Sequence, residues 1–140
     1  MANYSQPVEL STDTARQAAR RDISTGANIR MKSPVARHIN DDPAVWADLW
    51  RSGVRLGCVP YYMFVVRDTG AHDYFQLPLI RTWEIFQRGY RQVSGLARTV
   101  RGPTMSAFTG KVHVIGVTEV GCQKVFVLQY LHARDPTVVR

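Results

Sequence analysis

The chain has 140 residues, of which 45% are hydrophobic and 10% aromatic, so we expect one globular segment and exclude wholesale disorder. The formal net charge of +7 favours anionic partners in general without naming one. No apolar run approaches the roughly 20 residues of a membrane helix, and the N-terminal segment lacks a signal-peptide core. The chain has 2 cysteines, Cys58 and Cys122, and a reducing, cytoplasmic compartment is the simplest interpretation.

The charged and metal-ligating residue types form no compact motif. The densest basic cluster is Arg16, Arg20 and Arg21, on a predicted helix, and we interpret it as a solvated face rather than a functional patch. The 4 histidines have no ligand-like spacing, so no metal site is predicted in this chain. Nucleic-acid binding would rest on the net charge alone, so it is not expected.

In the first half of the chain, capping residues and periodicity predict two helices. Residues 1–10 are expected to be irregular. A helix capped by Ser11 or Thr12 should run to about Thr25, with Gly26 as its stop. A short strand is possible over 27–33, although Arg30 and Lys32 interrupt its apolar character. The run Asn40-Asp41-Asp42-Pro43 predicts a second helix start, with an apolar face of Trp46, Leu49, Trp50 and Val54 or Gly53.

The most apolar segment is 58–66, CVPYYMFVV, which ends at Arg67 and Asp68. Because it shows no polar alternation, we predict a strand buried on both faces in a parallel sheet. In parallel α/β folds the catalytic and ligand-binding residues lie just past the carboxyl ends of such strands. Arg67 and Asp68 are therefore the first place to look for chemistry.

The second half of the chain predicts one more helix and a hairpin. Pro78 should start a helix whose aromatic face, with Leu79, is core rather than a cofactor site. Residues 94–110 are expected to be a loop or short strand, and 134–140 irregular. Apolar and polar residues alternate in segments 111–117 and 124–131, and Glu119 to Gln123 lies between them. This pattern predicts an antiparallel hairpin. Strands alternating with helices indicate an α/β fold, and the chain is too short for a closed (β/α)8 barrel of about 250 residues.

Several ordered segments together resemble the lysine 2,3-aminomutase family of radical S-adenosylmethionine enzymes. The resemblance covers nearly the whole chain, from YSQPVELSTDTARQAARR through SPVARHINDDPAVW to the terminal hairpin. Its anchors are PYY at 60–62, WEIF at 83–86, SGLA at 94–97 and GK at 110–111.

This resemblance implies a partial (β/α) barrel of radical-SAM type: C-terminal βα units followed by an antiparallel hairpin. Family members bind a [4Fe-4S] cluster through CxxxCxxC, cleave S-adenosylmethionine to a radical, and hold the substrate amine on pyridoxal phosphate while the amino group migrates to the adjacent carbon. By position, Lys111 would be the lysine that forms the Schiff base with pyridoxal phosphate. Taken without the resemblance, Lys111 would be an ordinary solvent-facing strand lysine.

The chain departs from the family pattern in three ways. It contains no CxxxCxxC, and only Gly110 remains of the glycine run before the lysine. The two positions that hold the distal ammonium of lysine in the family are filled by Arg67 and Thr104. A charged guanidinium does not hold an ammonium, so Arg67 suggests an anionic or polar substrate side chain such as glutamate. The alternative is that Arg67 pairs with Asp68 or Asp73.

The sequence therefore predicts the C-terminal part of an amino-acid 2,3-aminomutase-like isomerase, carrying the cofactor lysine and part of the substrate pocket. Activity of the isolated chain is not expected, and a separate cluster-binding half or a second copy would be its partner. The alternative function is a non-catalytic basic binding module that retains the barrel remnant.

Overall fold

The computed structural model describes residues 1–66, 68, 70–135 and 137, so Arg67, Thr69, Pro136 and 138–140 lie outside the described residues. Six strands form one sheet in the order β1-β2-β3-β4-β5-β6. The elements are β1 (Ala2–Asn3), η1 (Pro7–Leu10), α1 (Asp13–Ser24), β2 (Arg30–Val35), α2 (Pro43–Arg55), β3 (Val59–Val65), α3 (His72–Phe75), α4 (Leu79–Arg91), η2 (Gly95–Thr99), β4 (Arg101–Ala107), β5 (Gly110–Val120) and β6 (Gln123–Ala133). Among the described residues, no helix combines the length and apolar character needed to span a bilayer.

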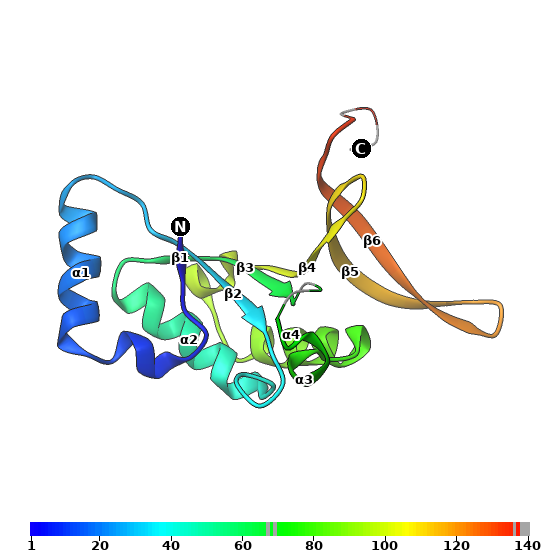
Figure 1. Ribbon diagram of the computed structural model, residues 1–140, viewed down its shortest axis with the longest axis horizontal. Helices are drawn as coiled ribbons and strands as arrows, with labels where there is room; N and C mark the ends of the chain where they lie inside the picture. Colours follow the sequence, from blue (N-terminus) through cyan, green and yellow to red (C-terminus); the bar gives the residue numbers. More distant parts are fainter. Residues whose placement is uncertain (67, 69, 136, 138–140) are drawn as a thin grey trace.

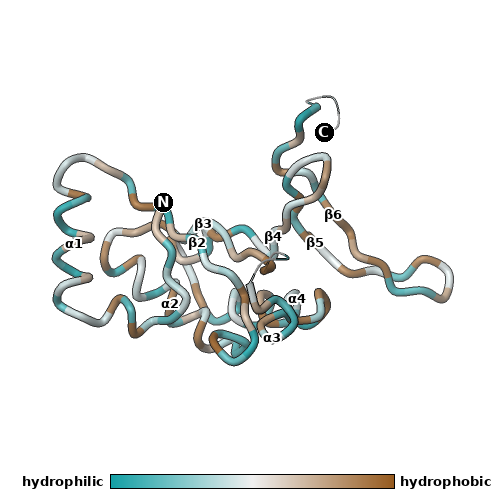
Figure 2. The backbone as a smooth tube through the Cα atoms, in the orientation of Figure 1, coloured by the Kyte–Doolittle hydropathy of each residue, from teal (hydrophilic) through white to brown (hydrophobic). Residues whose placement is uncertain are grey.

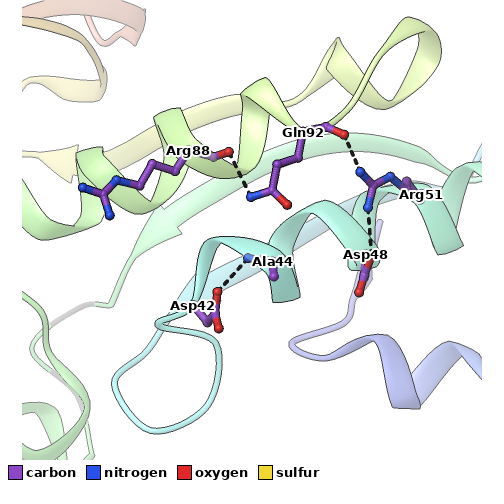
Figure 3. Close-up of polar contacts among 6 residues, drawn as sticks. All are labelled: Asp42, Ala44, Asp48, Arg51, Arg88 and Gln92. Carbon is purple, nitrogen blue, oxygen red and sulfur yellow. Dashed lines mark hydrogen bonds and ion pairs between the residues drawn. The ribbon is translucent and has the colours of Figure 1, made fainter.

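The helices begin at the capping residues that the sequence predicts. The Thr12 hydroxyl accepts the backbone N–H of Ala15 at the start of α1, and the Asp42 carboxylate accepts that of Ala44 at the start of α2. Figure 3 shows the Asp42 contact and a second one, in which Arg51 of α2 donates to the carbonyl of Gln92 beyond α4. The capping predictions for the two helices are thus confirmed.

The sheet is parallel in its first part and antiparallel in its last. Strands β1 to β4 pair in parallel, whereas β4–β5 and β5–β6 are antiparallel. The mixed α/β class and the hairpin are therefore confirmed, and the hairpin is longer than predicted, since β5 and β6 have 11 residues each. In Figure 1 it extends away from the body that holds the helices.

One face of the sheet is covered and the other is open. Figure 1 shows α2 and α4 on the same side of the strands. Their side chains and those of the covered face form a core around Trp46, Trp50, Met63 and Ile85. Along β2, buried residues alternate with Arg30, Lys32 and Pro34, which are not buried.

The prediction that 58–66 is buried on both faces is wrong for this chain. In β3, Pro60 and Met63 are buried, whereas Tyr61, Tyr62 and Phe64 are only half-buried. The physical reason is that the packed helices lie on one side, so the second face of β3 has no layer above it. The predicted parallel pairing of this strand is correct, because it pairs in parallel with both β2 and β4.

Residues 1–10, predicted to be irregular, form regular structure, and part of 94–110, predicted to be a loop or short strand, is a strand. Ala2–Asn3 is a strand and Pro7–Leu10 a 3-10 helix, and Arg101–Ala107 forms β4. Gly102 makes β4 possible beside β3, since a Cβ there would lie 2.7 Å from the carbonyl oxygen of Met63. Such close strand contact needs glycine.

Candidate functional site

Lys111 lies near the start of β5, half-buried, at the open face of the sheet. Its ammonium nitrogen is 4.3 Å from the centroid of the Tyr62 ring on β3. A cation above the face of an aromatic ring is held by the negative potential of the ring. Lys111 is therefore held against the sheet by this contact.

The backbone around Lys111 is positioned by Gly110. A Cβ at Gly110 would lie 2.1 Å from the carbonyl oxygen of His132 and 2.7 Å from the Cα of Ala133. The single glycine that remains before the lysine is thus required by the close approach of β6. Gly110 thus allows the backbone at the start of β5 to lie against β6, and this fixes the position of the Lys111 Cα.

A cavity of about 170 Å³ adjoins Lys111. Besides Lys111 it is lined by Lys32, Phe64, Val65, Met105 and Ser106. Lys32 comes from β2 and Lys111 from β5, so the two lysines enter the cavity from opposite sides of β3 in the sheet order. Three of the four other lining residues, Phe64, Val65 and Met105, are apolar.

A β-bulge places two tyrosines on the open face. Met31 pairs with Pro60 but Lys32 pairs with Tyr62, so Tyr61 is the extra residue. The rings of Tyr61 and Tyr62 lie 4.0 Å apart. A hydrogen bond from the Tyr62 hydroxyl, together with the Arg30 and Arg101 guanidinium groups, lowers the pKa of Tyr61. Burial raises the pKa of Tyr62, and its hydrogen bond to Tyr61 does so too.

The open face is cationic. Strands β2, β3 and β4 contain no aspartate or glutamate. Within the described part of the chain, no ion pair involves Arg30, Lys32, Arg101 or Lys111. Arg30 instead lies 5.0 Å above the Tyr61 ring. This face can therefore attract an anion, but it offers no carboxylate to hold a substrate ammonium.

The two residues predicted to contact the substrate, Arg67 and Thr104, are not both described by the structure. Arg67 lies outside the described residues. Thr104 is fully buried on β4, and its hydroxyl donates to the carbonyl of Met63 at 3.2 Å. Thr104 is near Lys111 in the sheet, because it pairs with His113 while Ser106, two residues further along β4, pairs with Lys111. It is not among the residues that line the cavity.

The carboxyl end of β3 opens into a second, mostly apolar cavity of about 330 Å³. Phe64 lines this cavity as well as the one beside Lys111. His72 lies at its edge, with Nε2 3.4 Å from Asp68 and Nδ1 3.5 Å from Asp73. The side chain of Asp68 is 97% exposed, so it lies out of the cavity.

The resemblance implies two groups, pyridoxal phosphate and an iron–sulfur cluster, and the described residues suit them differently. An amine on a half-buried lysine, a second ammonium and a hydroxyl around one cavity fit a carbonyl compound with an oxyanion, such as pyridoxal phosphate. For the cluster, the described residues include no group of three or more His, Cys, Asp or Glu placed to hold a metal. Cys58 is buried, where burial raises the pKa of its thiol, and Cys122 is exposed.

Sequence reasoning missed Lys32 and Ser106 and gave Tyr62 no role. The signal for Lys32 was present as a charged residue inside a predicted strand. A lysine at this place in a strand weakens the apolar pattern, and it also fits a strand that has one open face.

Comparison with known proteins agrees with the resemblance. No family model matches the chain. The chain is 32% identical over 136 residues to a protein of Aquifex aeolicus (strain VF5) named "Putative L-lysine 2,3-aminomutase". The match covers 97% of this chain and 35% of the relative, so the chain spans about a third of the length of that protein.

Proposed function

We propose that this chain, which is similar over nearly its whole length to part of a lysine 2,3-aminomutase relative, is the C-terminal portion of an amino-acid 2,3-aminomutase-like isomerase. It would supply the lysine that binds pyridoxal phosphate and part of the substrate pocket. The observation that carries the proposal is the placement of Lys111, half-buried over Tyr62 and lining a cavity with a second cation.

In this proposal the side chains around the cavity have separate tasks. Bound pyridoxal phosphate supplies an aldehyde carbon that condenses with amines and a ring that stabilises the charge or radical beside it. Lys111 presents its amine to that carbonyl, and Tyr62 restricts where the amine lies. Phe64, Val65 and Met105 keep water away from the reacting amine.

We further propose that the sheet is part of a (β/α) barrel of radical-SAM type. Support comes from the parallel strands β1 to β4 with helices on one face only. The open face would then point to the barrel interior. The cluster and S-adenosylmethionine would be held by residues other than those described here, in a further segment of the same protein or in a separate chain.

Exposed apolar side chains support such a larger assembly. On the β5–β6 hairpin, Ile115 is 46%, Val120 65% and Leu128 46% exposed. Figure 2 shows apolar positions along this hairpin outside the core. Apolar surface of this kind is usually covered by a partner. The free state of the two cysteines supports a reducing compartment such as the cytoplasm.

The substrate would be an amino acid with an anionic or polar side chain, contacted through Arg67. The cationic open face supports this, since no carboxylate on β2, β3 or β4 is available for a substrate ammonium. The test is a substrate screen on the complete, cluster-loaded protein and on its Arg67→Asp variant. Arg67→Asp should shift preference from glutamate toward lysine. A preference for lysine in the unchanged protein would contradict the substrate proposal.

The cofactor role is tested by trapping. The protein is incubated with pyridoxal phosphate, reduced with borohydride and digested, and the modified lysine is located by mass spectrometry. Lys111 should carry the adduct, and Lys111→Arg should abolish it while exposed Lys124→Arg should not. Modification spread over several lysines, or none at Lys111 even with the cluster-binding part present, would refute the role.

A non-catalytic basic binding module is the second candidate. The absence of ion pairs at Arg30, Lys32, Arg101 and Lys111 in the described part favours it. It predicts salt-dependent binding of polyanions without any adduct at Lys111. The trapping experiment therefore separates the two functions.

A further inference from the structure

We infer that Lys32 forms, together with Ser106, an oxyanion site facing Lys111 across the cavity of about 170 Å³. The inference rests on the proposed role of Lys111 as the lysine that bonds to a carbonyl ligand. It adds the residue that would hold the negatively charged part of that ligand. The ligand group is a phosphate or a carboxylate.

The position of Lys32 supports this assignment. Lys32 pairs with Tyr62 in the β2–β3 register, and Tyr62 is the residue whose ring contacts the ammonium of Lys111. The two lysines therefore flank the same tyrosine. Ser106 pairs with Lys111 in the β4–β5 register, which brings a hydroxyl donor to the same cavity wall.

The charge balance decides which ligand the cavity takes. Two lysines line it, together with three apolar residues and one serine, and none of the lining residues is acidic. Strands β2 to β4 supply no carboxylate either. A cationic ligand would be repelled, and a neutral one would leave two charges uncompensated beside apolar walls. An oxyanion is the group that this donor set satisfies, by charge-assisted hydrogen bonds.

The roles of the two lysines differ once a carbonyl ligand is bonded. Lys111 would use its nitrogen in the covalent bond, so it is no longer a free ammonium for the anion. Lys32 has no carboxylate partner among the described residues and stays available. It thus positions the ligand through its charged group, while Lys111 positions it through the bond.

The first arm of the test compares pyridoxal phosphate with pyridoxal, which lacks the phosphate. Adduct formation at Lys111 is followed by absorbance and by borohydride trapping, in the unchanged protein, in Lys32→Gln and in the control Lys124→Gln on exposed β6. If the oxyanion is the phosphate, Lys32→Gln should weaken binding of pyridoxal phosphate about tenfold or more and leave pyridoxal unchanged. Lys124→Gln should change neither.

The second arm tests the carboxylate. Alanine and ethylamine are compared for their ability to displace the preformed adduct from Lys111. If the oxyanion is the carboxylate, Lys32→Gln should weaken displacement by alanine about tenfold and leave ethylamine unchanged. The inference is wrong if Lys32→Gln changes neither the ratio of pyridoxal phosphate binding to pyridoxal binding nor the ratio of displacement by alanine to displacement by ethylamine. It is also wrong if the substitution weakens the effect of all four ligands equally.

Failure of the proposed function gives a different result. If no adduct forms in the unchanged protein, the role of Lys111 is wrong, and the Lys32 site is then decided by titration with inorganic phosphate alone. Binding that Lys32→Gln weakens and Lys124→Gln does not would support the oxyanion site. Circular dichroism and urea unfolding of each variant verify that the sheet is intact.

Discussion

The ammonium of Lys111 on β5 lies 4.3 Å from the centroid of the Tyr62 ring on β3, although β4 separates these strands in the sheet. The contact links the middle of β3 to the start of the β5–β6 hairpin. It also explains how a lysine at an open sheet face can be held in one place without a carboxylate partner.

The ring of Tyr62 should matter more than its hydroxyl. Tyr62→Leu removes the aromatic face, and we expect adduct formation between pyridoxal phosphate and Lys111 to weaken about two- to fivefold. Tyr62→Phe keeps the ring and should stay near the unchanged value. Tyr61→Leu is the matched control, because Tyr61 contacts Arg30 rather than Lys111. Equal losses in Tyr62→Leu and Tyr62→Phe would assign the role to the hydroxyl instead.

Gly110→Ala should disturb the start of β5. The new Cβ would meet the carbonyl oxygen of His132, so we expect a loss of about 1–3 kcal/mol in the free energy of unfolding and weaker adduct formation at Lys111. Gly116→Ala lies on the same strand with no atom within 4 Å of its Cβ and should change stability by about 0.5 kcal/mol at most. Urea unfolding measures both. Similar stability of the two variants would show that β6 can move away.

Thr104→Val tests whether this residue is structural. The substitution leaves the Met63 carbonyl without its side-chain donor in a buried position, which should cost about 1–3 kcal/mol. Thr118→Val on the exposed part of β5 is the control and should be nearly neutral. A variant that kept full stability but bound the amino-acid substrate more weakly would instead support the substrate role predicted from the resemblance.

His113 should make stability depend on pH. Burial lowers its pKa, the nearby Arg101 lowers it too, and a hydrogen bond to the Gly102 carbonyl opposes the shift. The unfolded chain, with a histidine pKa of about 6.5, therefore binds a proton at a pH where the folded chain does not. The contribution of His113 is fully present above that pKa and is lost as the pH falls below it.

We expect the free energy of unfolding to fall between about pH 7 and pH 5 and His113→Gln to flatten this slope. His132→Gln, at an exposed position of β6, is the matched histidine control. Urea unfolding at several pH values provides the measurement. An unchanged slope in His113→Gln would mean that another group causes the fall in the free energy of unfolding at low pH.

Local sequence signals were enough to place the starts of α1 and α2. Thr12 and Asp42 cap α1 and α2 as predicted, because a side-chain oxygen at the N-cap is a short-range feature. In α4 the periodicity was right, but the buried face is centred on Ile85 and Gly89. The aromatic residues Trp83 and Tyr90 pack at its margin, since the centre of that face depends on the neighbour α2.

By itself the sequence determined the α/β class, the parallel pairing of β3, the hairpin and the resemblance to the aminomutase family, because these depend on capping, periodicity and ordered anchors. The sequence leaves 94–110 open between a loop and a short strand, and the tertiary structure decides for β4, whose Gly- and Pro-containing sequence becomes a strand through its contacts with β3 and β5. The tertiary structure also decided that β3 has an open face and that Lys32 and Lys111 share a cavity. Their meeting depends on strand order and on which side the helices pack, and neither property resides in any one segment.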